Sequence, residues 1–146
     1  MLLRADRGNS MGRLYLEIVT PENVLVSQEV DTVVAPGSEG EFGVLPGHIH
    51  FLSGIVPGEL RYDSGTTKES MTVTDGFAEV SNDRVSILVD AAEKARDIDV
   101  ERARRAMERA EERLAKDRGT EDIDFARAET ALKRAIIRIK VAEKSK

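Results

Sequence analysis

The sequence predicts a mixed, mainly β fold: an N-terminal antiparallel β-sandwich followed by an all-α C-terminal two-helix hairpin. Between residues 14 and 89, short segments alternate apolar and polar residues and are separated by turn clusters, with no helical pattern between them. Around residues 91–95 the β-branched residues stop, and Ala, Arg and Glu take over at helical spacing. We therefore expect a β-sandwich domain over residues 11–91 and a helical hairpin over residues 92–146, joined by a short linker.

Residues 1–10 precede the sandwich and show no periodicity. They end in Gly8-Asn9-Ser10 before a second methionine, Met11. We expect a flexible leader, with an upstream start or an expression remnant as its origin.

The predicted strands are rich in β-branched residues and in alternating apolar positions. They span residues 14–18, 24–26, 30–35, 59–62, 69–74, 77–80 and 84–89. Clusters of Asp, Asn, Ser and Gly separate the later strands, as tight turns require. Closely spaced strands of this kind favour antiparallel pairing.

Two apolar stripes predict the hairpin. The first stripe consists of Val100, Ala103, Met107, Ala110 and Leu114, and the second of Phe125, Ala128, Leu132, Ala135, Ile139 and Ala142. Asp97 and Asp122 are the expected N-caps of the two helices, with Gly119 in the turn between them. Because alanine fills much of both stripes, the hairpin buries little apolar area and should be marginally stable on its own.

Composition and charge exclude several classes of function. The chain has 146 residues, 40% apolar content, no Cys and a net charge of −5. Residues 1–92 carry 6 basic and 14 acidic side chains (net −8), whereas residues 93–146 carry 16 and 13 (net +3). Acidic residues interleave the basic ones and few aromatics accompany them, so nucleic acid is not an expected partner. No apolar run approaches the roughly 20 residues that span a bilayer, so no membrane insertion is expected.

No catalytic or metal-binding pattern is present. His48 and His50 are the only imidazoles, and no carboxylates flank them at metal-site spacing. A Gly-x-Ser-x-Gly nucleophile motif is absent as well. We expect no catalytic residues, no metal site and a chain that is not an enzyme.

The segment 37–48 has the sequence Gly-Ser-Glu-Gly-Glu-Phe-Gly-Val-Leu-Pro-Gly-His. Its four glycines predict a loop with a defined backbone conformation, because glycine permits positive φ angles and close backbone approach. Pro46-Gly47 suits the central positions of a type II turn. The segment has no Lys and cannot be a phosphate-cradling loop. It is either a plain turn between strands or a protein-docking edge, and Glu39 and Glu41 beside exposed glycines favour the second.

Three arginines rise on one side of the second helix: Arg127, Arg134 and Arg138. Around Arg134 and Arg138 no acidic residue stands three or four positions away, so their like charges repel within the helix. An anion such as phosphate would relieve this repulsion, because the planar guanidinium suits it. The alternative is that these arginines pair with the acidic sandwich.

Three motifs in this order resemble the epsilon subunit of bacterial F-type ATP synthases. They are the segment 37–48, Asp-Gly-Phe-Ala-Glu-Val at residues 75–80, and Ala-Glu-Lys-Ala-Arg-Asp-Ile-Asp at residues 92–99. The likeness extends over residues 11–144. One departure is that His50 stands where the family usually has proline.

The resemblance implies a non-catalytic central-stalk (rotor) subunit of a proton- or sodium-translocating synthase. Its sandwich would touch the gamma subunit and the c-ring, with Ser38, Glu39, Glu41 and His48 forming the docking loop. Its hairpin would fold down or extend into the catalytic alpha/beta hexamer and inhibit ATP hydrolysis. For this brake, the net positive hairpin would meet an acidic surface through Arg127, Lys133 and Lys140. The subunit would sit peripherally at the cytoplasmic face of the bacterial plasma membrane.

Residues 98–103 further resemble the Ile/Leu-Asp-x-x-Arg-Ala motif of epsilon subunits that bind ATP. The resemblance implies an ATP site made of Glu93, Asp99, Arg102, Arg134 and Arg138. No cofactor is required in this interpretation, and ATP would be a regulatory ligand. The alternative function is a free-standing β-sandwich ligand-binding module whose helices form a sensor or a dimerising tail.

Overall fold

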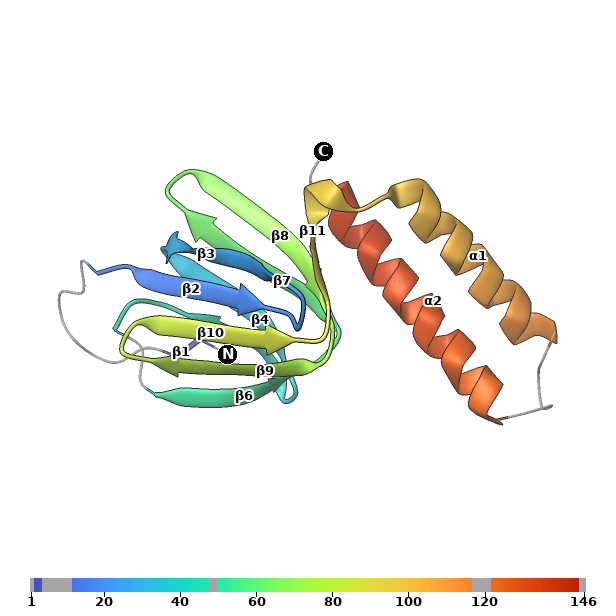
Figure 1. Cartoon of the computed structure of the whole chain (residues 1–146), viewed down its shortest axis with the longest axis horizontal. Helices are drawn as coiled ribbons and strands as arrows, with labels where there is room; N and C mark the ends of the chain where they lie inside the picture. The colour runs from blue at the N-terminus through green and yellow to red at the C-terminus, as the bar shows by residue number, and fades with distance from the viewer. Residues whose placement is uncertain (1, 4–11, 48–49, 117–121, 145–146) are drawn as a thin grey trace. The chain divides into compact units, whose positions relative to one another are not determined.

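The computed structural model describes residues 2–3, 12–47, 50–116 and 122–144 (Figure 1). The chain divides into two compact units, Met1–Lys94 and Ala95–Lys146. The first is a β-sandwich and the second contains the two helices, so the predicted fold class is confirmed.

Eleven strands make up the first unit within the described residues. They are β1 (Leu2–Leu3), β2 (Leu14–Val19), β3 (Val24–Val30), β4 (Thr32–Gly37), β5 (Gly40–Val44), β6 (Phe51–Ile55), β7 (Gly58–Ser64), β8 (Thr67–Val73), β9 (Gly76–Ser81), β10 (Arg84–Val89) and β11 (Ala92–Lys94).

These strands form one continuous sheet in the order β11-β8-β7-β4-β6-β9-β10-β2-β3, with β5 paired to β4 and β1 to β5. The sheet bends into two layers: β6, β9, β10 and β2 form one, and β4, β7 and β8 the other (Figure 1). Most pairs are antiparallel, as predicted, but β10 pairs with β2 in parallel, and so does β1 with β5. Inward residues of both layers fill one apolar core, and those with no exposed surface include Leu14, Leu16, Ile18, Leu60, Met71, Val80, Val85 and Ile87.

Three elements differ from the predictions. The middle of the expected loop, residues 40–44, is strand β5, which pairs with β4 from Val33↔Val44 to Gly37↔Gly40. Strand β6 was not predicted, and it pairs with β9. The expected linker contains β11, which pairs with β8, so the sandwich ends at Lys94 rather than at residue 91. Glycine and serine lower the intrinsic strand propensity of β5 and β6, and neighbouring strands override it.

Two residues of the predicted leader, Leu2 and Leu3, belong to the part of the chain that the structure describes. These residues form β1 beside β5, because backbone pairing with Gly43 and Val44 gives the two apolar residues a strand partner. Residues 1 and 4–10 lie outside the described part of the chain.

The second unit starts with a short 3-10 helix, Ala95–Asp97, followed by α1 (Val100–Lys116) and α2 (Asp122–Glu143). The predicted alanine seam is present: Ala103, Ala110, Ala128, Ala135 and Ala142 are all buried. Small side chains at seven-residue spacing let two helix backbones approach closely. Phe125, also expected in the seam, is 36% exposed.

The cap of α1 differs from the prediction. Asp97 lies in the 3-10 helix, and Asp99 is the capping residue, because its carboxylate accepts a hydrogen bond from the backbone N–H of Arg102 at 3.0 Å. The expected roles of Gly119 and of the Asp122 side chain fall outside the described residues. Among the described helices, neither is long and apolar enough to cross a bilayer.

Candidate functional site

The predicted docking segment begins with a tight turn between β4 and β5, with Ser38 and Glu39 at its tip. Two glycines shape this turn. A Cβ on Gly37 would lie 2.7 Å from the carbonyl oxygen of Gly40, and Gly40 itself has a φ of 116°. The fold therefore requires the glycines, whereas Ser38 and Glu39 are exposed.

The turn is braced against β6 and its continuation. The backbone N–H of Ser38 donates to the carbonyl of Gly54 at 3.0 Å, and that of Val56 donates to Pro36 at 3.0 Å. A Cβ on Gly54 would lie 3.1 Å from the Ser38 hydroxyl oxygen, so glycine also permits this close approach. We call the residues Ser38, Glu39, Gly40 and Glu41 the docking turn.

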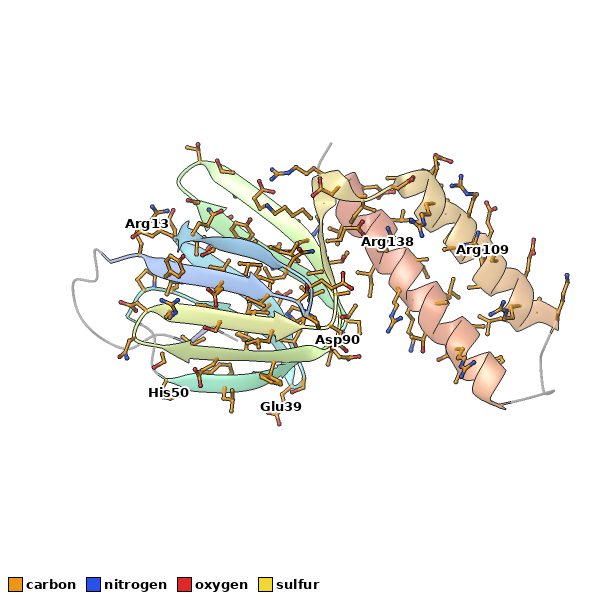
Figure 2. The ribbon with its side chains drawn as sticks, viewed as in Figure 1. Arg13, Glu39, His50, Asp90, Arg109 and Arg138 are labelled. Carbon is orange, nitrogen blue, oxygen red and sulfur yellow. The ribbon has the colours of Figure 1, made fainter. Side chains whose placement is uncertain are left out.

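A groove of about 350 Å³ lies beside the docking turn. The docking turn and Phe42 line it together with Phe51, Leu52, Ser53 and Gly54 of β6. Figure 2 shows Glu39 at this end of the sandwich. Carboxylates beside aromatic rings suit a basic side chain with an apolar stem.

The end of the predicted segment also has defined geometry. Gly47 has a φ of 83°, which fits the third position of the predicted type II turn after Pro46. Its backbone N–H donates to the Asp83 carboxylate at 2.7 Å, which ties this loop to the turn between β9 and β10. His48, the last predicted docking residue, lies outside the described residues, and His50 is exposed.

Glu41 is held by an arginine that sequence reasoning did not single out. Arg61 of β7 reaches across β4 and contacts both carboxylate oxygens of Glu41, at 3.2 and 3.4 Å. It also donates to Glu59 at 3.0 Å. Hydrogen bonding to Glu41, and then to Glu59, raises the pKa of Arg61, whose burial acts in the opposite direction.

A second exposed surface was also missed. Leu52, Phe77 and Leu88 are 67%, 55% and 46% exposed, and they stand on the outer side of β6, β9 and β10. Phe77 pairs with Leu88 on one side and with Gly54 on the other. We call these three residues the apolar patch. Strand alternation could have found it, because buried Ala78 and Val80 send Phe77 outward.

In the helical unit, residues 98–103 separate into structural and exposed positions. Ile98 is buried in a small cluster with Ala95, Val141 and Ala142, while Ala103 is fully buried. Asp99 caps the helix. Arg102 is exposed, so the fold alone does not account for it.

The predicted nucleotide residues are distributed over both units. The cluster around Ile98 places the start of α1, with Asp99 and Arg102, beside the end of α2, where Arg138 lies. Arg134 is exposed one turn earlier, and Arg138 is half-buried and has an interaction partner. Glu93 belongs to β11 of the sandwich unit. Within the helical unit, Asp99 and Arg102 thus lie at the start of α1, and Arg138 belongs to the last turns of α2.

A basic stripe on α1 was missed as well. Its members are exposed and follow one another at spacings of three or four: Arg102, Arg105, Arg109, Arg113 and Lys116. Residues so spaced lie on one side of a helix, and Figure 2 marks Arg109 within the stripe. The signal was available in the sequence, but interleaved glutamates at other angles obscured it.

In the described part of the chain, no group of three or more His, Asp or Glu side chains is placed to hold a metal ion.

Comparisons with known proteins identify the class of this chain. The family model for the β-sandwich domain of the ATP synthase delta/epsilon chain matches residues 13–95, and that for the long α-helix domain of the same chain matches residues 96–143. The fold and both matches define a non-catalytic subunit class of ATP synthase. Within this class, the chain belongs to the ATP synthase epsilon chain family.

Relatives in this family match over almost their whole length. The chain is 55% identical over 135 residues to the ATP synthase epsilon chain of Syntrophobacter fumaroxidans, covering 91% of this chain and 98% of the relative. It is 52% identical over 128 residues to that of Nitratidesulfovibrio vulgaris strain DP4, covering 88% and 94%.

Among solved structures, the chain resembles one from the Euglena gracilis mitochondrial ATP synthase, in an OSCP/F1/c-ring assembly. The TM-score is 0.76 and the identity 26%, over 92% of this chain and 84% of that one. Membership in the family replaces the alternative of a free-standing ligand-binding module.

Proposed function

We propose that this epsilon chain is a central-stalk subunit that couples the c-ring to the gamma subunit and restrains ATP hydrolysis through its helices. The Euglena relative comes from an assembly that contains F1 and the c-ring, which supports this place in the complex. The proposed location is peripheral, at the cytoplasmic face of the bacterial plasma membrane, in a proton- or sodium-translocating synthase.

The apolar patch carries the docking part of this proposal. Clustered Leu and Phe side chains on the outside of a sheet are costly to leave in water and mark interaction surfaces. We assign the patch to the gamma subunit and the docking turn, with Ser38, Glu39, Glu41 and His48, to a basic loop of the c-ring. The patch and the groove beside the docking turn share Leu52, so the two surfaces adjoin and can bridge two neighbouring partners.

Phe77→Asp tests the docking surface. A charge at the centre of an apolar interface should weaken binding to an epsilon-depleted synthase by about 2 kcal/mol or more. Thr67→Asp is the matched control, since Thr67 is an exposed residue of β8 next to the turn with β7. Equal binding of both variants in a pull-down titration would remove the patch from the interface.

The basic stripe supports the proposed restraint of hydrolysis. An extended line of guanidinium groups fits an acidic surface, and such contacts weaken with salt. Arg127, Lys133 and Lys140 are exposed on α2 and remain candidates. However, Lys133 forms an ion pair with Glu129 at 3.5 Å within α2. The stripe on α1 is longer and continuous, so it is the stronger candidate for the contact with an acidic surface.

We further propose that ATP is a regulatory ligand of the helical unit. Arg134 and Arg138 would take the phosphates, Arg102 would tie the helices to the ligand, and Asp99 would hydrogen-bond the base or ribose region. Ligand that binds only the closed hairpin stabilises it by roughly 2.7 kcal/mol at a hundred times its dissociation constant. ATP would thus oppose the extension of a marginal helix pair and relieve the restraint on hydrolysis.

Calorimetry with ATP tests this ligand. The wild type should bind, and Arg102→Gln and the double variant Arg134→Ala, Arg138→Ala should bind at least tenfold more weakly, as loss of charged contacts implies. Lys116→Gln removes a basic charge at the far end of α1 and serves as the control. No heat from the wild type at millimolar ATP would remove the nucleotide proposal.

A further inference from the structure

Arg61 of β7 is linked to β5 by side-chain contacts that cross the strand between them, β4. It is opposite Val34 of β4, and Glu41 of β5 is opposite Pro36 on the far side of β4. The guanidinium therefore crosses the outer surface of β4 to reach Glu41. Because both carboxylate oxygens accept from different guanidinium nitrogens, the contact fixes the orientation of the carboxylate as well as its distance.

Glu59 in turn fixes Arg61. Its carboxylate, only 16% exposed, accepts from Nη1 of Arg61 at 3.0 Å. The Arg61 side chain is 37% exposed and that of Glu41 is 56% exposed. The series runs from a mostly covered carboxylate, through a half-buried guanidinium, to an open carboxylate at the rim of the groove.

The linked side chains of Glu59, Arg61 and Glu41 are informative because of where they lie rather than because of their contribution to stability. Exposed ion pairs add little to folding, so stability alone gives a weak reason for a bidentate bridge across three strands. Glu41 lines the groove beside the docking turn, while Arg61 is outside the groove lining. Arg61 can therefore influence the groove only indirectly, by holding the Glu41 carboxylate that lines it.

We propose that Arg61 is a positioning residue of the docking turn, which holds Glu41 ready to receive an arginine or lysine side chain from a loop of the partner subunit. This inference rests on the proposed docking function of the turn. Charge complementarity identifies the occupant, because the carboxylates of Glu39 and Glu41 and the ring of Phe51 all line the groove.

A positioning role and a purely electrostatic role of Arg61 predict opposite changes in binding affinity for Arg61→Gln. Loss of the positive charge leaves the docking turn more negative, which by itself attracts a basic partner more strongly. Loss of the fork removes two hydrogen bonds that orient the Glu41 carboxylate, and this orientation must then be regained on binding. If positioning dominates, the variant binds about two- to tenfold more weakly through faster dissociation, the range expected for ordering one side chain.

The experiment measures binding kinetics of the full chain to an epsilon-depleted synthase. The variants are Arg61→Gln, Arg61→Lys, Glu41→Gln and the double variant Arg61→Gln, Glu41→Gln. Lys68→Gln is the charge-matched control, because Lys68 is exposed on β8 of the same β7–β8 hairpin. Urea unfolding midpoints verify that each variant is folded.

The proposal predicts weaker binding for Arg61→Gln, no further loss when it is added to Glu41→Gln, and no change for Lys68→Gln. Arg61→Lys keeps the charge without the fork and should also bind more weakly. If Arg61→Gln binds as tightly as the wild type or more tightly while Glu41→Gln binds more weakly, the positioning role of Arg61 is overturned but the docking function of the turn is not. Unchanged binding of Glu41→Gln would overturn the docking function of the turn and the role of Arg61 with it.

Discussion

Position 76 requires glycine because the backbones of β9 and β10 lie in close contact there. A Cβ at this position would lie 1.9 Å from the carbonyl oxygen of Leu88 and 2.7 Å from Cα of Val89. Both neighbours belong to β10, which pairs with β9 along its whole length. The space cannot be made by rotating a side chain, so β9 and β10 must separate if the residue grows.

Gly76→Ala should therefore lower the free energy of unfolding by about 3 kcal/mol, the upper part of the usual range for overpacking. Gly54→Ala is the control, because its Cβ would meet only the side chain of Ser38. Urea unfolding of the two variants measures the difference. An equal and small loss in both would contradict the backbone contact at Gly76.

Asp31 gives the sandwich a dependence on pH. Its carboxylate accepts from the backbone N–H of Gly65 at 2.7 Å and from Arg13 at 3.1 Å. The Gly65 bond, aided by Arg13 against a smaller effect of desolvation, holds the pKa of Asp31 below its usual value of 3.8. The charged form is thus favoured in the folded state.

A lowered pKa stabilises the fold at pH values above 3.8, and this contribution is lost as the pH falls through the folded-state pKa. Asp31→Asn should lower the unfolding midpoint at pH 7, and the gap to the wild type should narrow below about pH 4. Asp90→Asn, at another exposed aspartate, is the control. A gap that is the same at pH 7 and pH 3 would show that the carboxylate charge is not responsible.

At the residue scale, the sequence predicted the exposed acidic residues of the docking turn but not the arginine that contacts Glu41. The glycines on either side of Ser38 and Glu39 predict a tight turn, and the tip of such a turn faces solvent. Arg61 and Glu41 are 20 residues apart, and only the register of β7, β4 and β5 brings them together. Strand register depends on the whole sheet, so no local pattern contains it.

The helical hairpin depends on small residues at its seam. Ala103 is fully buried and Ala110 is 5% exposed, seven residues apart on α1. The sequence predicted this element well, because a long amphipathic stripe is the strongest local signal. It misplaced the cap at Asp97, since Asp97 and Asp99 are chemically equivalent and only the backbone geometry distinguishes them.

Ala110→Leu should destabilise the hairpin by about 1–3 kcal/mol, because the added atoms force the two helices apart. Ala115→Leu on the same helix is exposed and should have little effect. Hydrogen exchange of the α1 and α2 amides measures the two variants. Equal protection in both would mean that the seam is loose.

Strands β5, β6 and β11 were harder to predict than the helices. Gly40 and Gly43 interrupt β5, Ser53 and Gly54 interrupt β6, and β11 has only three residues. Each becomes a strand because a neighbour satisfies its backbone: β4, β9 and β8 respectively. Such pairing is a tertiary effect and outweighs the weak local preference.

At the scale of the whole molecule, the chain consists of two units with different compositions and proposed roles. The sandwich has a continuous apolar core and carries the docking turn and the apolar patch. The helical unit has a thin alanine seam and carries the basic stripe. Because the two cores are separate, the sandwich should fold without the helices, provided that β11 is kept.

The most direct test of this division is the rate of ATP hydrolysis by an epsilon-depleted synthase to which the full chain or residues 1–94 are added in saturating amounts. We predict that both bind, and that only the full chain lowers the rate. A full chain with Arg105, Arg109 and Arg113 replaced by Gln should lower it less, and high salt should mimic this change. If residues 1–94 bind and inhibit as strongly as the full chain, the helices are not the restraint and the account is contradicted.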